Sequence, residues 1–428
     1  MSQIVVAIDL GTSRSAWAFS IKGRAEGDII IRIPEGSFSS SSGMKTETAV
    51  LLDSESGEFR AFGHAACEAF INETEDDEGV LDDGAEAGEH GLKASSTALF
   101  RWFKVALCEK RGYQSIHDPV VAAEGGQKKQ LLHVVSTALR HFRQDILRHL
   151  TAVSGVVRTA CDLTWVLTIP AIYDDFAKRF MCHAAFEAGI ISSVDSPRLQ
   201  LCLEPEAACL AMSIKEAPLV CQPGANLMIV DCGGGTVDIT THEVISTGPL
   251  RLKELLPPTG GPWGSTCVDK AFKEWLEAFM GKDNCDRMRH LPSFYTLMLQ
   301  WGDGKTWFNG GIEDIVRINL GEISRNLEIK SSDMKVHLDG PCYLVKLTGG
   351  KFLVVIPSPV VISFFSSTME RIGTCLENLK HSDALRHLCT SSLSGGFRPA
   401  LLSSRSPARN SKETGVRWCL PFGRMWPS

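Results

Sequence analysis

Two short segments of the chain combine an aspartate, glycine and hydroxyl side chains in a pattern suited to phosphate and metal chemistry. In the first, an apolar stretch carries Asp9 near its end and a polar turn follows at residues 11–13. In the second, an apolar stretch carries Asp231 near its end and a glycine-rich turn follows at residues 233–236. Glycine leaves backbone N–H groups open to an anion, hydroxyls add donors, and a carboxylate holds Mg²⁺ or its water molecules.

Each turn lies between two stretches whose apolar or alternating residues predict β-strands, so either turn alone is explained by a hairpin without a ligand. The repetition of the design far along the chain indicates an internal duplication at the scale of a domain. Two such turns facing each other across a cleft would clamp the phosphate tail of a nucleotide. The pair therefore indicates a nucleotide site, whereas a single turn would not.

The elements that must position these turns alternate between strands and helices, which indicates an α/β architecture. Apolar runs bounded by turn residues predict the strands, and apolar residues at three- and four-residue steps predict the helices. We expect strands at residues 48–52 and 163–169, helices at 99–112, 130–153 and 174–190, and a strand leading into a helix at 199–214.

Composition and charge exclude several classes of function. The 428 residues, 44% of them hydrophobic, predict a globular protein of two to four domains, and a net charge of −6 offers no basic face for nucleic acid. No apolar run is long enough to span a membrane, and the first apolar stretch has no basic leader, so no signal peptide is expected. The 14 cysteines contain no C-x-x-C pair, so we expect no metal cluster and free thiols in the cytoplasm.

The sequence around both turns resembles a known family. IDLGTSRS is similar to the first phosphate motif, and VDCGGGTVDIT to the second, of the actin-like ATPase superfamily, in particular of the 70-kilodalton heat-shock proteins. EPEAACLA resembles the segment that connects their two lobes. KTETAVLLD, FGHAA, WVLTIPAIYDDFAKRFMCHAAFEAGI and GGPWGSTCVDKAF resemble the divergent member-12 branch of that family. The resemblance extends from Ile4 to about Leu402 and fades after Asp283.

This resemblance implies an α/β fold of the actin-like ATPase type, a duplicated ribonuclease H-like design, with two lobes around a nucleotide cleft. The implied lobes span residues 1–190 and 191–402. Residues 72–90 are acidic and poor in apolar residues, so we expect a flexible insertion there. Residues 403–428 have no apolar period and no family likeness, so we expect a disordered tail on a chain that looks truncated or alternatively ended, without a peptide-binding domain.

The resemblance also implies which residues hold ATP or ADP with Mg²⁺. Asp9 and Asp231 would hold the metal through water, and residues of both turns would contact the β- and γ-phosphates. A glycine pair further along would approach the phosphates from the second lobe. The implied phosphate-side residues are Gly11, Thr12, Ser13, Arg14, Gly233, Gly234, Gly235, Thr236, Gly260 and Gly261.

Three further residues match catalytic positions of the family. Lys104 would approach the γ-phosphate, although without the family it is read as a solvated lysine on an amphipathic helix. Glu204 would help to place the attacking water, although before Pro205 it also suits the first turn of a helix. Asp238 matches a second acid near that water.

The adenosine side departs from the family pattern. In the family, a helix supplies a glutamate and, three residues later, a lysine, and both contact the ribose and adenine. In this sequence Gly302 occupies the position of the glutamate and Lys305 that of the lysine. Gly395 and Gly396 match a glycine pair that lies beneath the adenosine. The sequence therefore predicts an intact phosphate end and an altered base end.

The resulting hypothesis is Mg-ATP binding and slow hydrolysis coupled to closure of the lobes, with protein partners that the sequence does not identify. An alternative is a non-hydrolysing interaction protein that senses nucleotide. A third hypothesis, a small-molecule kinase on the same fold, lacks a recognisable acceptor-binding feature. The sequence leaves open whether the chain is an enzyme.

Overall fold

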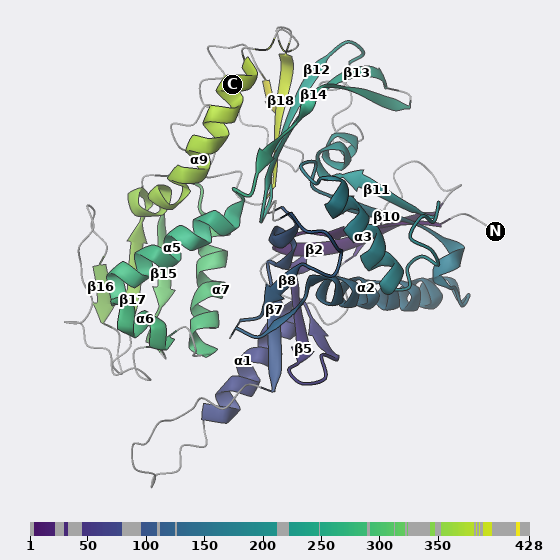
Figure 1. The fold of residues 1–428 in the computed structure, drawn as a ribbon. Coiled ribbons are helices and arrows are strands. Elements are labelled where there is room, and N and C mark those ends of the chain that lie inside the picture. Colours follow the sequence, from purple (N-terminus) through teal and green to yellow (C-terminus); the bar gives the residue numbers. More distant parts are fainter. Residues whose placement is uncertain are drawn as a thin grey trace.

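The chain forms a mixed α/β structure with several sheets and with helices packed against them (Figure 1). No helix in the described residues is long and apolar enough to cross a lipid bilayer. The computed structural model describes residues 4–21, 30–32, 45–78, 96–108, 112–124, 126–211, 222–247, 249–288, 292–311, 313–321, 323, 343–346, 352–380, 382, 385, 388–395 and 417–419.

The first of two larger sheets carries the first polar turn. Its strands lie in the order β11-β10-β1-β2-β3, and β4 pairs with β2. β1 is parallel to β10 and antiparallel to β2, so residues 11–13 close a hairpin between β1 and β2. The strands are β1 (Ile4–Leu10), β2 (Arg14–Ile21), β3 (Ile30–Arg32), β4 (Thr46–Glu47), β10 (Leu163–Ile169) and β11 (Leu199–Leu203).

The second larger sheet repeats this strand order and carries the glycine-rich turn. Its strands lie in the order β14-β13-β12-β18-β19. β12 is parallel to β18 and antiparallel to β13, as β1 is to β10 and β2, which agrees with an internal duplication. The strands are β12 (Asn226–Cys232), β13 (Val237–Thr247), β14 (Leu250–Gly261), β18 (Leu388–Gly395) and β19 (Arg417–Cys419).

The fifth strand of this second sheet comes from the segment expected to be a disordered tail. β19 pairs in parallel with β18, as β11 pairs with β10. Three residues are too few to show a strand period in the sequence, which is why the pattern did not predict β19. The rest of the expected tail, residues 403–416 and 420–428, lies outside the described residues.

Two long helices cover the first sheet, and both lie where the sequence predicted them. Residues of α2 (Leu131–Ser154) and α3 (Asp175–Glu187) share one hydrophobic core with β1, β2 and β10. Asp174 caps α3 by accepting a hydrogen bond from the N–H of Ala177, and Gly155 ends α2 in the left-handed conformation. The amphipathic pattern and the end residues together explain why the prediction was correct here.

The elements from β12 to β19 form the second half of the molecule, and those before β12 form the first half. The core of the second half joins the larger sheet to several helices and to the small sheet β15-β17-β16. At its centre the ring of Trp301 stacks on that of Phe272, with centroids 4.2 Å apart. The elements around it are α5 (Ser265–Met280), α6 (Lys282–Met288), α7 (Pro292–Trp307), α9 (Ser358–Lys380), β15 (Ile315–Asn319), β16 (Tyr343–Lys346) and β17 (Phe352–Pro357).

A second small sheet belongs to the first half and contacts the second half. The sheet has the order β6-β5-β7 and packs with α1, whose Phe70 meets Tyr295 of α7 at 5.0 Å between ring centroids. In Figure 1, α1 lies beside the lower end of α7. The elements are β5 (Ala49–Asp53), β6 (Phe59–Phe62), β7 (Thr97–Arg101) and α1 (His64–Glu78), with the hairpin β8 (Val120–Ala122) and β9 (Lys128–Gln130) nearby.

One local prediction was wrong, and a second concerns residues that the structure describes only in part. The helix expected over residues 99–112 is instead the end of β7 followed by a 3-10 helix, Phe103–Leu107. Trp102 lies between them in the left-handed conformation, with φ 52°, which a continuous α-helix does not allow. Residues 72–78 of the expected flexible insertion continue α1, whereas residues 79–90 lie outside the described residues. The error at residues 99–112 comes from an apolar pattern that the left-handed backbone at Trp102 overrules.

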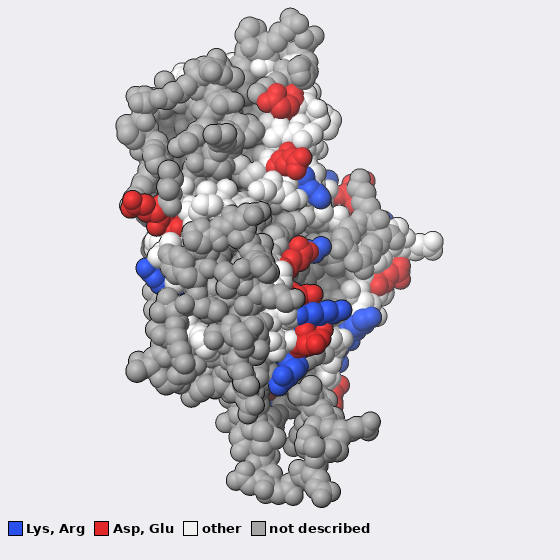
Figure 2. Space-filling model, turned by 90° about the vertical axis from the view of Figure 1, so that its left-hand side faces the viewer, with Lys and Arg blue, Asp and Glu red and all other residues white. Residues whose placement is uncertain are grey.

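The described charged residues are mixed on the face shown in Figure 2. Two acidic groups lie in the upper part of this view, and acidic and basic side chains lie next to one another further down, in keeping with the slightly negative net charge of −6. Such a mixture is typical of an ordinary solvated surface.

The stacked pair at the centre of the second half provides a test of this core. Trp301 is fully buried, so Trp301→Ala should lower the free energy of unfolding by about 3–5 kcal/mol through the lost contacts and the cavity. Equilibrium urea unfolding measures this change. Trp307→Ala on the same helix is the control, because Trp307 is 69% exposed and should change stability by less than about 0.5 kcal/mol. Equal stability of both variants would contradict the described packing.

Candidate functional site

The two turns lie against each other. A Cβ atom added at Gly234 would overlap the Ser13 hydroxyl, and one added at Gly235 would lie 2.7 Å from Thr12 Oγ1. Only glycine therefore permits this approach of the second turn to the first. The structure thus brings together the two turns that the sequence singled out.

The second turn is fixed by the start of α5. The N–H groups of Gly264, Ser265 and Thr266 donate to the carbonyl oxygens of residues 235, 233 and 234, at 3.1, 3.1 and 2.9 Å. These bonds turn the three carbonyls toward α5 and keep them from competing for the space in front of the turn. Gly264 is required for the contact, because a Cβ atom there would lie 2.5 Å from the Gly234 carbonyl oxygen.

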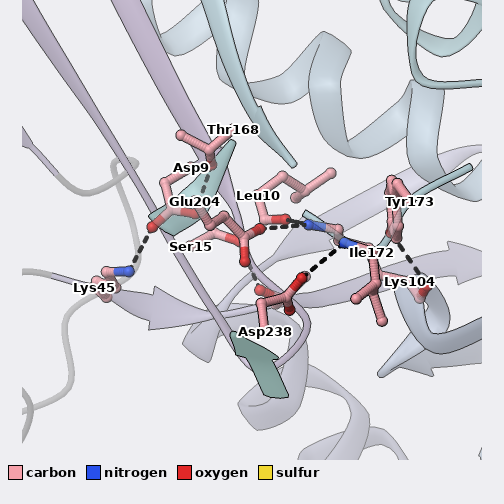
Figure 3. A network of polar contacts seen from close by, with 11 residues as sticks. Asp9, Leu10, Ser15, Lys45, Lys104, Thr168, Ile172, Tyr173, Glu204 and Asp238 are labelled. Carbon is pink, nitrogen blue, oxygen red and sulfur yellow. Dashed lines mark hydrogen bonds and ion pairs between the residues drawn. The ribbon is translucent and has the colours of Figure 1, made fainter. Parts of the chain in front are cut away.

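Asp9 lies on the side of β1 opposite to the core. Alternate residues of β1 are buried, and the period of two leaves Asp9 facing the site (Figure 3). Its Oδ2 accepts from Lys45 Nζ at 2.5 Å, and its Oδ1 accepts from Thr168 Oγ1 at 2.9 Å. Burial raises the pKa of Asp9, but the charges of Lys45 and Lys104 and these hydrogen bonds outweigh burial and lower it below its ordinary value. Asp9 is therefore an ionised carboxylate.

Lys104 is a buried structural cation. Its side chain is 1% exposed, and its Nζ donates to the backbone carbonyl of Leu10 at 2.5 Å and lies 3.4 Å from Glu204 Oε1. The Leu10 carbonyl immediately precedes the first turn, so Lys104 holds the end of β1 (Figure 3). The interpretation as a solvated lysine was wrong, because Trp102 turns the following 3-10 helix and its lysine into the core.

Glu204 begins the helix that follows β11 and carries an unusually basic carboxylate. Its side chain is 19% exposed. Burial, the largest cause, raises the pKa of Glu204 to about 7; Lys104 opposes the rise, and the charges of Asp9 and Asp231 add to it. A carboxylate that titrates near neutral pH can accept a proton from water and release it again.

Asp238 links the two halves of the molecule. It lies on β13, is 1% exposed, and accepts a hydrogen bond from the backbone N–H of Ile172, just beyond β10, at 2.9 Å. Burial and the charge of Glu204 raise the pKa of Asp238 to about 6, while hydrogen bonds from Thr236 and Ile172 oppose the rise. The predicted second acid therefore lies close enough to Glu204 for the charge of Glu204 to raise its pKa. Its hydrogen bond with Ile172 also joins the two larger sheets.

Several other predicted residues flank the second turn. Gly260 and Gly261 pair with Asp238 and Val237 across β14 and β13, and a Cβ atom at Gly261 would meet the Trp263 ring 2.6 Å away. Gly395 ends β18 opposite Cys232, and Gly396 lies outside the described residues. The structure places these glycines beside strands at the turn, and their contact with a ligand stays a prediction.

Arg14 and Gly11 frame the first turn. Arg14 begins β2 opposite Glu47 of β4, so it leaves the turn in a strand. A Cβ atom at Gly11 would overlap the carbonyl oxygen of Arg14, which explains the glycine at this tight corner.

Lys305 holds α7 to the start of α5. Its Nζ lies 2.6 Å from Asp269 Oδ1 and 3.1 Å from Ser265 Oγ, and Asp269 also accepts from Trp301 Nε1 at 2.8 Å. Lys305 is thus one residue removed from the second turn, since Ser265 bonds to that turn. A Cβ atom at Gly302 would meet no atom within 4 Å, so a side chain could begin there without a clash.

Lys45 and Thr168 are site residues that the sequence did not predict. Both contact Asp9, yet Lys45 lies in a segment noted only for its family likeness, and Thr168 lies in a segment noted for its apolar strand and its family likeness. The one available indication was a polar residue, Thr168, at a position before Pro170 where an apolar strand ends. Pattern reading along the chain cannot pair residues this far apart.

The donors at the turns fit Mg²⁺ with phosphates. In the described part of the chain, no three His, Cys, Asp or Glu side chains form a group that could hold a metal ion alone. Mg²⁺ keeps several of its water molecules and is commonly held by one or two carboxylates plus substrate phosphates. Asp9 and Asp231 beside hydroxyl-rich turns suit that mode and not an all-protein metal cage.

Comparison with known proteins finds heat-shock relatives. The chain is 30% identical over 337 residues to human heat shock 70 kDa protein 12A, and the alignment covers 67% of this chain and 47% of that protein. It is 30% identical over 331 residues to human heat shock 70 kDa protein 12B, covering 65% and 45%. The chaperone protein HscA homolog of Pasteurella multocida is 28% identical over 242 residues, covering 52% and 36%. The chain spans about half the length of the two human relatives, and no family model matches it.

The raised pKa of Glu204 predicts a pH-dependent contribution to stability. The pKa of an ordinary glutamate is near 4.5, whereas burial raises the pKa of folded Glu204 to about 7. This shift therefore contributes up to about 3 kcal/mol to the free energy of unfolding. The contribution is complete below about pH 4.5 and is lost as the pH rises through 7. The melting temperature of the wild type minus that of Glu204→Gln should decrease as the pH rises from about 5 to about 8. A difference that does not change with pH would contradict the burial of this carboxyl group.

The contact between the turns predicts a penalty for one methyl group. Gly234→Ala should lower the free energy of unfolding by about 1–3 kcal/mol, because its Cβ overlaps Ser13. Gly302→Ala is the matched control, since its Cβ meets no atom within 4 Å and alanine favours a helix, so stability should stay or rise by about 1 kcal/mol. Urea unfolding of both variants measures the difference. A Gly234→Ala protein as stable as the control would show that the turns do not touch.

Proposed function

Because the chain belongs to the 70-kilodalton heat-shock protein family, we propose that it binds Mg-ATP between its two turns and hydrolyses it slowly. The observation that carries this proposal is the direct contact of the turns at residues 11–13 and 233–236, each preceded by an aspartate. Backbone N–H groups, hydroxyls and carboxylates meet there from two separate sheets. Such a set suits a phosphate tail with its metal.

Family membership implies the actin-like ATPase fold, and the repeated strand order of the two larger sheets supports two lobes of one design. We place β11 with the first lobe, beyond the boundary at residue 190 suggested by the sequence, because it pairs with β10. The second lobe then begins with β12 and includes the small sheet β15-β17-β16. The nucleotide would lie where the two lobes meet.

The metal would be held through water by Asp9 and Asp231. Bound there, Mg²⁺ would neutralise charge on the β- and γ-phosphate oxygens. Thr12, Ser13 and Thr236 bring hydroxyl groups to the same place, and Lys104 keeps the end of β1 in position through the Leu10 carbonyl. These groups bind and orient the ligand, and orientation accounts for much of the catalysis of phosphoryl transfer.

Glu204 is the residue suited to the attacking water. In its ionised form it would accept a hydrogen bond from that water and orient the oxygen, and its pKa of about 7 allows it to hold the released proton for a time. The charge of Glu204 raises the pKa of Asp238, and the hydrogen bond from the Ile172 N–H to Asp238 joins these surroundings to the other half.

Entry of a phosphate tail requires the two halves to move. The turns are in contact, so phosphates between them must separate residues 11–13 from residues 233–236. The Asp238–Ile172 hydrogen bond and the Phe70–Tyr295 contact join the same halves and would adjust with this movement. Binding and lobe motion are therefore coupled in this proposal.

The adenosine side determines how well the base is held. The glutamate that the family resemblance implies is absent at Gly302, where a Cβ atom would meet no atom within 4 Å, and Lys305 is bound to Asp269. We expect weaker selection of adenine over guanine than a site with both polar groups would give. A chain that binds nucleotide but releases no phosphate would be a sensor and not an ATPase.

Binding is tested by melting in the presence of Mg²⁺ and ATP. Ligand at a hundred times its Kd should stabilise the wild type by about 2.7 kcal/mol, whereas Asp231→Asn should reduce the shift and slow phosphate release at least about tenfold. Asp195→Asn, on an exposed loop, is the control and should behave as the wild type. Absence of any shift with ATP, ADP or GTP would contradict nucleotide binding. Equal phosphate release by the wild type and Asp231→Asn would contradict hydrolysis at this site.

A further inference from the structure

A lysine outside both turns holds the carboxylate assigned to the metal. Lys45 lies just before β4, and its Nζ is 2.5 Å from Asp9 Oδ2. The Lys45 side chain is 50% exposed, whereas Lys104 is 1% exposed and fixed to a backbone carbonyl. Figure 3 shows Lys45 and Lys104 on opposite sides of Asp9. Lys45 is therefore the ammonium that can move without breaking the core.

The surroundings of Lys45 are those of a metal position. The carboxylates of Asp9, Glu204 and Asp231 raise the pKa of Lys45, Asp9 most strongly, while burial opposes them. These three acids are the ones that the proposed function assigns to the metal and the attacking water. With Lys45 on one oxygen of Asp9 and Thr168 on the other, both oxygens are engaged by donors of the protein.

Lys45 and a divalent cation compete for Asp9. Two cations that share one carboxylate repel each other, so metal binding favours departure of the ammonium. The flexible four-carbon stem of lysine allows such a movement. A triphosphate at the turns would offer Lys45 a new anion, its terminal phosphate, close to the one it leaves.

We propose that Lys45 is an exchangeable cation, which neutralises Asp9 in the ligand-free protein and transfers to the terminal phosphate when Mg²⁺ and a nucleoside triphosphate bind. This inference rests on the proposed function and adds a residue that distinguishes triphosphate from diphosphate. A diphosphate lacks the group that receives Lys45, so it displaces the lysine less readily. Metal and triphosphate therefore bind cooperatively, because each removes the obstacle to the other.

The test compares Lys45→Gln with the wild type by calorimetric titration of ATP and of ADP at several Mg²⁺ concentrations. Loss of a charged contact to the terminal phosphate should reduce the ratio of ATP to ADP affinity about tenfold. The Mg²⁺ concentration that gives half-maximal ATP binding should fall, because no ammonium competes for Asp9. Lys45→Arg keeps the charge and should retain most of the affinity ratio.

Lys253→Gln is the matched control, since it removes a lysine from an exposed pair with Glu243 on β13 and should change neither quantity. An unchanged affinity ratio and Mg²⁺ midpoint in Lys45→Gln, with ATP still bound by the wild type, would overturn this inference and leave the proposed function intact. Failure of the wild type to bind ATP with Mg²⁺ would overturn both. Melting curves without ligand show whether each variant is folded.

Discussion

The contact between two glycine-containing turns is the constraint on which the arrangement of the site depends. Each turn closes a hairpin at the end of a central strand, and the second is held from behind by three backbone hydrogen bonds to the start of α5. Side chains at Gly234 or Gly235 would push the two sheets apart. The same contact brings carboxylates from both halves into one small region. The charge balance of that region then decides what the protein can bind.

Acidic groups at the site are only partly balanced by the protein itself. Lys45 and Lys104 compensate Asp9, but the pKa values of Glu204 and Asp238, raised to about 7 and about 6, show that burial and mutual repulsion still act on the other acids. A divalent cation would relieve this repulsion. The electrostatics therefore favour a ligand that carries its own metal, which is the physical basis for choosing a metal nucleotide over a free anion.

Patterns along the chain predicted the elements whose residues repeat regularly or whose ends are marked. The hairpins at Asp9 and Asp231 and the helices α2 and α3 are of this kind. The family resemblance supplied Lys104 and Glu204, and the structure brings them within 3.4 Å of each other. Contacts that depend on tertiary packing were missed, namely Lys45 on Asp9 and the burial of Lys104 behind Trp102. The strand β19 was also missed, because its partner β18 and not its own sequence gives it a place.

The most direct measurement of the central claim is a crystal structure with Mg²⁺ and a non-hydrolysable ATP analogue. The account predicts the β- and γ-phosphates between residues 11–13 and residues 233–236, with the turns separated and the metal's water shell facing Asp9 and Asp231. It also predicts that Glu204 faces the terminal phosphate. A nucleotide bound elsewhere, with the contact between Gly234 and Ser13 unchanged, would contradict it.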